Sequence, residues 1–99
     1  MKLPYYAVIF TSIRTKEDEA EYLKMAIKME QLAQQQEGFL GIESARNEIG
    51  ITVSYWKDIE SIKKWKQNLD HIEAQVKGRS FWYEKYKVRI ALVEREYEL

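Results

Sequence analysis

The feature that most constrains this chain is a regular change between two kinds of apolar spacing. Segments rich in β-branched and aromatic residues, which favour strands, alternate with longer segments whose apolar residues recur about every three or four positions, as on one face of a helix. Tyr5 to Ile13 is a segment of the first kind. From about Lys16 to Gln36 the spacing is helical. The apolar stripe of this segment consists of Tyr22, Met25, Ala26, Met29, Leu32 and Ala33.

A pair of strand-like segments follows this predicted helix. Gly38 is a natural stop for the helix, because glycine readily adopts the conformation that ends one. Phe39 to Arg46 and Ile51 to Trp56 then predict two strands, and Asn47 to Gly50 between them predicts a tight turn. The middle of the chain is therefore a β-hairpin.

A second amphipathic segment and a last strand complete the chain. Asp58 can cap the second helix, and Gly78 ends it. Asn68 to Asp70 offers a further capping group, so we expect a break or kink there. The segment from Tyr86 to Glu96 predicts the last strand. The apolar stripe of the second helix comprises Ile59, Ile62, Trp65, Leu69, Ile72 and Val76.

The predicted order of elements is β-α-β-β-α-β within a single domain, residues 1–99. This is the ferredoxin-like arrangement of α+β proteins, a four-stranded antiparallel sheet with two helices on one face. The strands carry apolar residues on both faces, so the second face needs a cover. We expect a homodimer that packs its sheets face to face. The alternative is that Thr52 and Ser54 let that face contact water.

Composition excludes several functional classes. The 99 residues include 16 Lys plus Arg and 16 Asp plus Glu, whereas a nucleic-acid-binding protein normally carries a basic surplus. The absence of cysteine excludes disulfides, thiolate nucleophiles and Fe–S clusters, and a single histidine argues against a zinc site. No charge-free apolar run approaches the roughly 18 residues of a membrane-spanning helix. We therefore expect a cytoplasmic protein without a membrane or nucleic-acid partner.

Short groups of residues distributed over nearly the whole chain indicate a family. They are Gly38–Gly41, Tyr55–Asp58, Trp65, His71, Gly78–Arg79, Trp82–Tyr83, Tyr86 and Val93–Tyr97. In order and spacing they resemble the antibiotic-biosynthesis-monooxygenase-like family of dimeric α+β barrels. The resemblance implies a ferredoxin-like fold, a dimer built through the sheets and a small-molecule ligand. It leaves the reaction open, because the superfamily includes cofactor-independent oxygenases and haem-degrading enzymes.

The haem-degrading subgroup provides the main alternative. Trp56 and, nine residues later, Trp65 match its pattern, in which the second tryptophan crowds the porphyrin. Ten residues further on that subgroup has its iron-binding histidine, and this chain has Gln75. His71 stands one helical turn earlier. An amide is a poor substitute for an imidazole at iron, so the resemblance favours a protein without a cofactor.

The expected catalytic residues are His71 and Arg79. His71 is the only histidine, and imidazole is the side chain whose ordinary pKa is closest to neutral, which suits a base or a positioning donor. An exposed or helix-capping histidine is the alternative. Arg79 can pair with a ligand anion through its planar guanidinium, or form a salt bridge with Glu84 or Glu73.

Aromatic residues supply the expected ligand-binding wall. The residues expected to bind ligand are Phe10, Trp65, Gln75, Trp82 and Tyr86. For Trp65 the alternative is a place in the core, since it lies on the apolar stripe of the second helix. Together with these features, the family resemblance implies a small-molecule monooxygenase, cofactor-independent and acting on an aromatic or polyketide-like substrate. A haem-degrading enzyme and a non-catalytic metabolite-binding dimer remain as alternatives.

Overall fold

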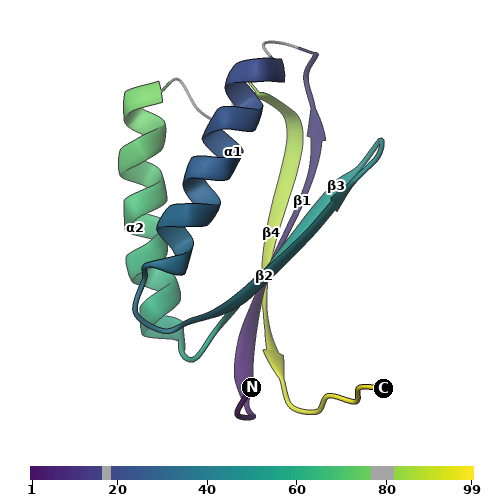
Figure 1. Cartoon of the computed structure of the whole chain (residues 1–99), viewed down its shortest axis with the longest axis vertical. Coiled ribbons are helices and arrows are strands. Elements are labelled where there is room, and N and C mark those ends of the chain that lie inside the picture. Colours follow the sequence, from purple (N-terminus) through teal and green to yellow (C-terminus); the bar gives the residue numbers. More distant parts are fainter. Residues whose placement is uncertain (17–18, 77–81) are drawn as a thin grey trace.

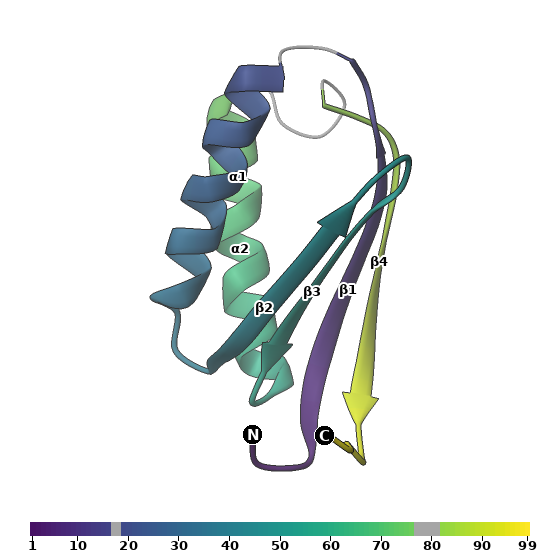
Figure 2. The same ribbon diagram turned by 45° about the vertical axis from the view of Figure 1, so that its right-hand side comes forward.

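The computed structural model describes residues 1–16, 19–76 and 82–99, with residues 72–76 described by their backbone only. Its elements follow the predicted β-α-β-β-α-β order. They are β1 (Tyr5–Arg14), α1 (Glu19–Gln34), β2 (Phe39–Arg46), β3 (Gly50–Trp56), α2 (Ile59–Val76) and β4 (Tyr83–Val93). The strands form one antiparallel sheet in the order β2-β3-β1-β4. Both helices lie on the same face of this sheet (Figures 1 and 2).

Strand β1 lies inside the sheet and pairs with β3 on one side and β4 on the other. Its even-numbered side chains face the helices, because Tyr6 and Val8 pack against the buried core. Directly paired residues share a face of the sheet. Val8 pairs with Ser54 and Ile90, so these two residues also lie on the helix-covered face.

The core fills one end of the layer between helices and sheet, which we call the closed end. It consists of Ala33, Trp56, Ile62 and Trp65. Trp56 has no exposed surface, and its ring stacks on that of Trp65 at a centroid distance of 6.0 Å and an angle of 26°. The indole nitrogen of Trp56 donates a hydrogen bond of 2.9 Å to Ser54 Oγ, which satisfies its buried polar group.

Two local contacts join this core to the chain around it, and the first of them, the Asp58 cap, was predicted from the sequence. The backbone N–H of Ser61 donates to Asp58 Oδ1 at 2.8 Å, so Asp58 caps α2. Hydrogen bonds from Ser61 favour the charged form of Asp58 and lower the pKa of its carboxyl. Gly38 has a φ of +85°, and a Cβ at this position would collide with the side chain of Ser61. Only glycine fits there without strain.

Helix α2 contradicts the predicted break at Asn68 to Asp70, because it runs without interruption from Ile59 to Val76. The polar side chains in question bond away from their own backbone. Asn68 Nδ2 donates to Gln36 Oε1 at 3.0 Å, and Asp70 pairs with Lys66 one turn earlier at 3.0 Å. The helical hydrogen bonds therefore remain uninterrupted.

Strand β4 begins earlier and ends earlier than the predicted Tyr86–Glu96 segment. The long partner strand is the reason, because Arg14 at the end of β1 pairs with Tyr83, and Tyr5 at its start pairs with Val93. The suggestion that Thr52 and Ser54 lie on the face of the sheet without helices is also wrong. These even-numbered residues lie on the helix-covered face, where Ser54 is buried.

Neither helix, within the described ranges, has the length and apolar character needed to cross a membrane.

Candidate functional site

The other end of the helix–sheet layer is different in kind from the core, and we call it the open end. Here β1 ends, α1 begins and β4 begins, at the top of the molecule in Figure 1. Side chains from these elements and from β2 meet between the helices and the sheet. They are Phe10, Ser12, Arg14, Tyr22, Arg46, Trp82, Tyr83 and Tyr86.

Aromatic rings form the frame of the open end. Phe10 stacks on Tyr86 at 5.6 Å and 29°, and meets Tyr83 edge-on at 5.3 Å. Tyr22, from α1, contacts both Trp82 and Tyr83 at centroid distances of 5.9 Å. Edge and offset contacts of this kind are favourable arrangements for aromatic rings. The aromatic frame therefore connects α1 with β4 through Phe10 of β1, a strand inside the sheet.

Two arginines approach the same tyrosine ring. The guanidinium carbon of Arg14 lies 3.5 Å from the centre of the Tyr22 ring, and that of Arg46 lies 5.9 Å from it. Cations over the face of an aromatic ring are attracted by its electron density. Arg14 also pairs with Glu19 at 3.1 Å, whereas Arg46 Nη2 donates to Ser12 Oγ at 2.6 Å. The open end thus combines positive charge with apolar walls.

The hydroxyl groups of Tyr22 and Tyr83 lie 3.3 Å apart, with that of Tyr83 donating. Burial, followed by this contact, raises the pKa of Tyr83 well above its ordinary value, although Arg46 and Arg14 partly oppose the shift. Tyr83 is therefore protonated at neutral pH and acts as a hydrogen-bond donor.

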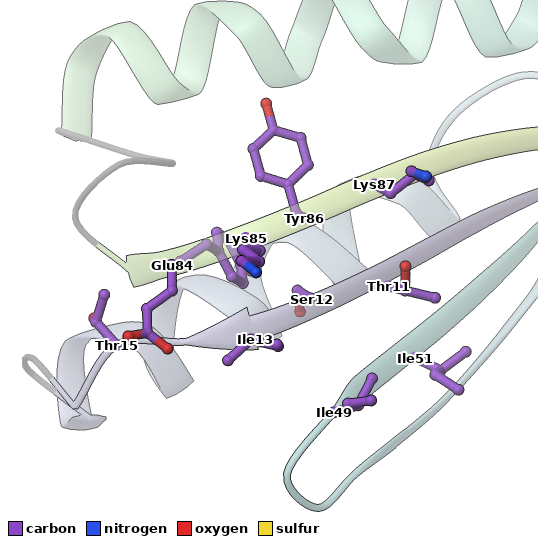
Figure 3. Close-up of a pocket in the computed structure, with 11 residues that line it drawn as sticks. Thr11, Ser12, Ile13, Thr15, Ile49, Ile51, Glu84, Lys85, Tyr86 and Lys87 are labelled. Atoms are coloured by element: carbon purple, nitrogen blue, oxygen red, sulfur yellow. The ribbon is translucent and has the colours of Figure 1, made fainter.

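An apolar strip along β4 continues from this frame. Tyr86, Val88, Ile90 and Leu92 are 40%, 48%, 52% and 46% exposed. They occupy alternate positions and pair with Ser12, Phe10, Val8 and Tyr6, so they lie on the face that carries the helices. Figure 3 shows the side chain of Tyr86 directed toward α2. The helices leave this strip accessible at the edge of the sheet.

A broad depression lies next to these residues, toward the outer face of the sheet (Figure 3). Its lining includes Thr11, Ile13, Ile49, Ile51, Lys85 and Lys87. The volume, about 1260 Å³, exceeds the range of about 300–1,000 Å³ typical of enclosed ligand pockets. Ile49 and Ile51 are 56% and 45% exposed. The depression is therefore an open, largely apolar surface whose lining also includes Glu84, Lys85 and Lys87.

The structure brings three of the expected ligand-binding residues together: Phe10, Trp82 and Tyr86 all belong to the open end. Trp65 instead packs against Trp56 in the closed end, where it is 8% exposed. This is the core position that its place on the apolar stripe had suggested.

The structure describes the expected catalytic residues only in part. His71 lies on α2 with an exposed side chain. Gln75 belongs to α2 by its backbone, and its side chain lies outside what is described; Arg79 lies outside the described residues altogether. Of the two residues weighed for haem, His71 is exposed and Trp65 is packed into the core.

Sequence reasoning missed Ser12, Arg14, Tyr22 and Arg46 as site residues. One signal was available for Tyr22, the only residue with a hydroxyl group on the apolar stripe of the first predicted helix. For the two arginines the signal is their position at the ends of predicted strands. Long charged side chains at such places can turn over the face of a sheet instead of into water.

Comparison with known proteins identifies the family. A model of the af470-like monooxygenase family matches residues 10–97, and the chain belongs to this family. It is 48% identical over 95 residues to the uncharacterized protein YqjZ of Bacillus subtilis, a match that covers 94% of this chain and 82% of that protein. The resemblance to antibiotic-biosynthesis-monooxygenase-like proteins is thereby confirmed.

Solved structures share the fold at low sequence identity. A conserved protein from Methanosarcina mazei superposes with a TM-score of 0.72 at 14% identity, covering 95% of both chains. A protein from Bordetella bronchiseptica, named as a candidate antibiotic biosynthesis monooxygenase, gives 0.69 at 15% identity and covers 89% of this chain and 95% of its own. These likenesses establish the ferredoxin-like fold.

Proposed function

We propose that this protein is a small-molecule monooxygenase that acts without a bound cofactor on an aromatic or polyketide-like substrate. Membership of the af470-like monooxygenase family supports the reaction class. The observation that carries the proposal is the open end, where half-exposed rings, phenolic hydroxyls and two guanidinium groups face one another between helices and sheet.

The chemistry that suits this arrangement starts from a substrate with an acidic CH₂ group beside a phenol or carbonyl. Removal of a proton leaves a delocalised anion, which gives an electron to dioxygen. Completion of the reaction turns CH₂ and O₂ into C=O and H₂O, so that atoms and electrons balance. The protein then has two tasks, to stabilise the anion and to exclude water.

The residues of the open end fit these two tasks. Phe10 and Tyr86, stacked at 5.6 Å, offer a planar surface for the rings of the substrate. Tyr83 donates its hydroxyl proton to Tyr22, which leaves the hydroxyl proton of Tyr22 to donate to a substrate oxygen. The guanidinium groups of Arg14 and Arg46 favour the anion and so lower the pKa of the bound substrate. The apolar strip of β4 accommodates the remainder of a hydrophobic molecule.

A dedicated base is dispensable in this scheme, because an acidic phenol or 1,3-dicarbonyl ionises in bulk water before it binds, and the positively charged site then binds the anion. His71 and Arg79 remain predicted catalytic residues on the sequence resemblance. Replacing each in the oxygen assay described below tests them directly.

The test uses 1,8-dihydroxyanthrone as a substrate probe, with oxygen uptake and quinone absorbance followed in the presence of EDTA. We expect the protein to accelerate both, and Tyr86→Ala and Arg46→Gln to lower kcat/KM by about tenfold or more. Lys28→Gln, which removes an exposed positive charge on α1, should leave the rate unchanged. Binding of the probe without acceleration would instead identify a non-catalytic metabolite-binding protein.

The proposal includes a homodimer formed through the outer face of the sheet. The exposed Ile51 and the apolar depression around it are the surface that a second copy would cover. Ile51→Glu should then halve the mass measured by light scattering after gel filtration. Ile27→Glu is the matched control, because Ile27 is 59% exposed on α1, away from this face. A wild-type protein of monomeric mass would refute the dimer.

A further inference from the structure

The guanidinium of Arg46 occupies the space above a glycine on the neighbouring strand. Arg46, the last residue of β2, pairs with Gly50, the first residue of β3. A Cβ atom on Gly50 would collide with Arg46 Nη2 and Cζ, and would lie 2.7 Å from Nε. Any residue other than glycine at this position would displace the guanidinium, since real Cβ atoms do not approach so closely.

The far side of the guanidinium is held by the next strand. Gly50 also pairs with Ser12 of β1, so Arg46, Gly50 and Ser12 stand in one row across three strands. Arg46 Nη2 donates to Ser12 Oγ at 2.6 Å, and Ser12 is only 3% exposed. A short hydrogen bond to a buried hydroxyl fixes the direction of the side chain. The guanidinium therefore lies over β3, and its carbon is 5.9 Å from the centre of the Tyr22 ring at the open end.

The positive charge held in this way differs from that of its neighbour. Arg14 is paired with Glu19 at 3.1 Å. For Arg46, no carboxylate oxygen lies within ion-pair distance among the residues that the structure describes. The residue is exposed, and several N–H donors remain beside the one bound to Ser12. A charge fixed in position and open to solvent next to aromatic rings is suited to bind an anion.

We infer that Arg46, positioned through Gly50 and Ser12, recognises the anionic oxygen of the ligand at the open end and so selects planar aromatic carboxylates or phenolates over neutral aromatics. The planar fork of arginine matches such oxygens. The stacked rings of Phe10 and Tyr86 supply the apolar contact for the rest of the ligand. The inference rests on the site of the proposed function, but it concerns binding and requires no turnover.

The test compares 2-naphthoate with 2-naphthamide, which differ in charge and share the same ring system. Isothermal titration calorimetry at constant ionic strength should show tighter binding of the naphthoate to the wild-type protein. Arg46→Gln should weaken naphthoate binding by about ten- to hundredfold, because one charge-assisted contact is lost. Naphthamide binding should change by less than about twofold, as expected for contacts elsewhere in the site.

Gly50→Ala is the sharper variant, because it keeps every charge and only displaces the guanidinium. It should reproduce the loss seen with Arg46→Gln. Ser12→Ala covers the case in which Gly50→Ala fails to fold, since it releases the guanidinium without adding a side chain to β3; a severalfold loss of naphthoate affinity is expected. Lys28→Gln, which removes a charge outside the site, should bind both probes as the wild type does.

Two results would overturn the inference. One is an unchanged preference for naphthoate in Arg46→Gln, and the other is an equal loss for both probes, which indicates a merely structural role. Failure of the proposed function gives a different pattern. In that case the naphthoate preference and its dependence on Arg46 persist, while 1,8-dihydroxyanthrone is not oxidised. If the anthrone is oxidised but the preference is absent, the inference alone fails.

Discussion

The closed and open ends of the helix–sheet layer are both rich in aromatic residues, yet they differ in burial and in the polar groups between the rings. At the closed end Trp56 is fully buried against Trp65, and the polar atom of its ring is bonded to Ser54. At the open end Tyr86 keeps 40% of its surface exposed, and the rings alternate with guanidinium and hydroxyl groups.

This difference shows what distinguishes a core from a candidate binding site of similar composition. Apolar area that is already buried stabilises the fold and contributes no further free energy when a ligand binds. Apolar area that remains exposed gains free energy only when a ligand or a partner covers it. Aromatic content alone therefore does not separate the two ends, whereas the charged and hydroxyl groups placed between the rings do.

The largest expected effect comes from removing the central ring of the closed end. Trp56→Ala should lower the free energy of unfolding by about 3–5 kcal/mol, as large-to-small changes in cores do. Tyr86→Ala at the open end should cost less than about 1.5 kcal/mol, because its ring is partly exposed in the folded state. Urea unfolding followed by circular dichroism measures both. Equal losses would show that the open end is part of the core.

Substitutions at two glycines test the packing next to the closed end. Gly38→Ala should destabilise the protein by about 1–2 kcal/mol through its left-handed backbone alone, with the collision against Ser61 in addition. Gly41→Ala is the matched control, because a Cβ there would meet Met1 and Tyr55 at ordinary distances of 3.5 and 3.7 Å. It should change the stability by less than about 0.5 kcal/mol. Similar losses in the two variants would contradict the assigned geometry.

The cap of α2 at the closed end predicts a dependence on pH. The pKa of Asp58 is lower in the folded state than its ordinary value of 3.8, so the charged carboxylate stabilises the fold above that pH. The contribution disappears as the pH falls through the lowered pKa. Asp58→Asn keeps a capping side chain but carries no charge. The difference in urea midpoint between wild type and variant should shrink in acid, and a constant difference would refute the prediction.

The smallest effect concerns two tyrosines whose pKa values are raised for different reasons. A hydrogen bond of 2.6 Å to Glu96 is the main reason that the pKa of Tyr5 is raised from 10.0 to about 12. Burial is the main reason for the raised pKa of Tyr83. In an ultraviolet titration, Glu96→Gln should therefore return one tyrosine toward pH 10 and leave the shift of Tyr83 in place.

The same shift has a consequence for stability in alkali. The pKa of Tyr5 is higher in the folded state than in the unfolded state, so its contribution is complete below pH 10 and is lost as the pH rises toward 12. The wild type should lose stability more steeply than Glu96→Gln across this interval. Parallel stability curves would show that Glu96 does not control this hydroxyl.

The periodicity of the chain was sufficient to predict the fold. The stripe on α1 and the Asp58 cap are local properties, and the structure confirms both. The predicted break at Asn68 was wrong because the partner of that side chain, Gln36, lies on the segment after α1 and is distant in sequence. Spacing within one segment carries no information about such partners.

The site was less predictable for a related reason. Phe10, Trp82 and Tyr86 could be proposed from their chemistry, but the position of the Arg46 guanidinium depends on a glycine on another strand. That relation depends on the pairing register of β2 with β3, which a single sequence does not reveal. Trp65 shows the reverse case, since its aromatic ring suggested a ligand and its neighbours assign it to the core.

The double pairing of β1 has a consequence for how this protein can vary. Its helix-facing residues pass from the closed end at Tyr6 to the open end at Ser12 along one strand, held in register by β3 and β4 together. Inserting one residue into this strand would invert every side chain beyond it and dismantle core and site at once. Changes in the length of the connecting loops leave that register intact. Divergence among relatives should therefore accumulate as loop insertions and as substitutions at the open end, with the length of β1 held constant.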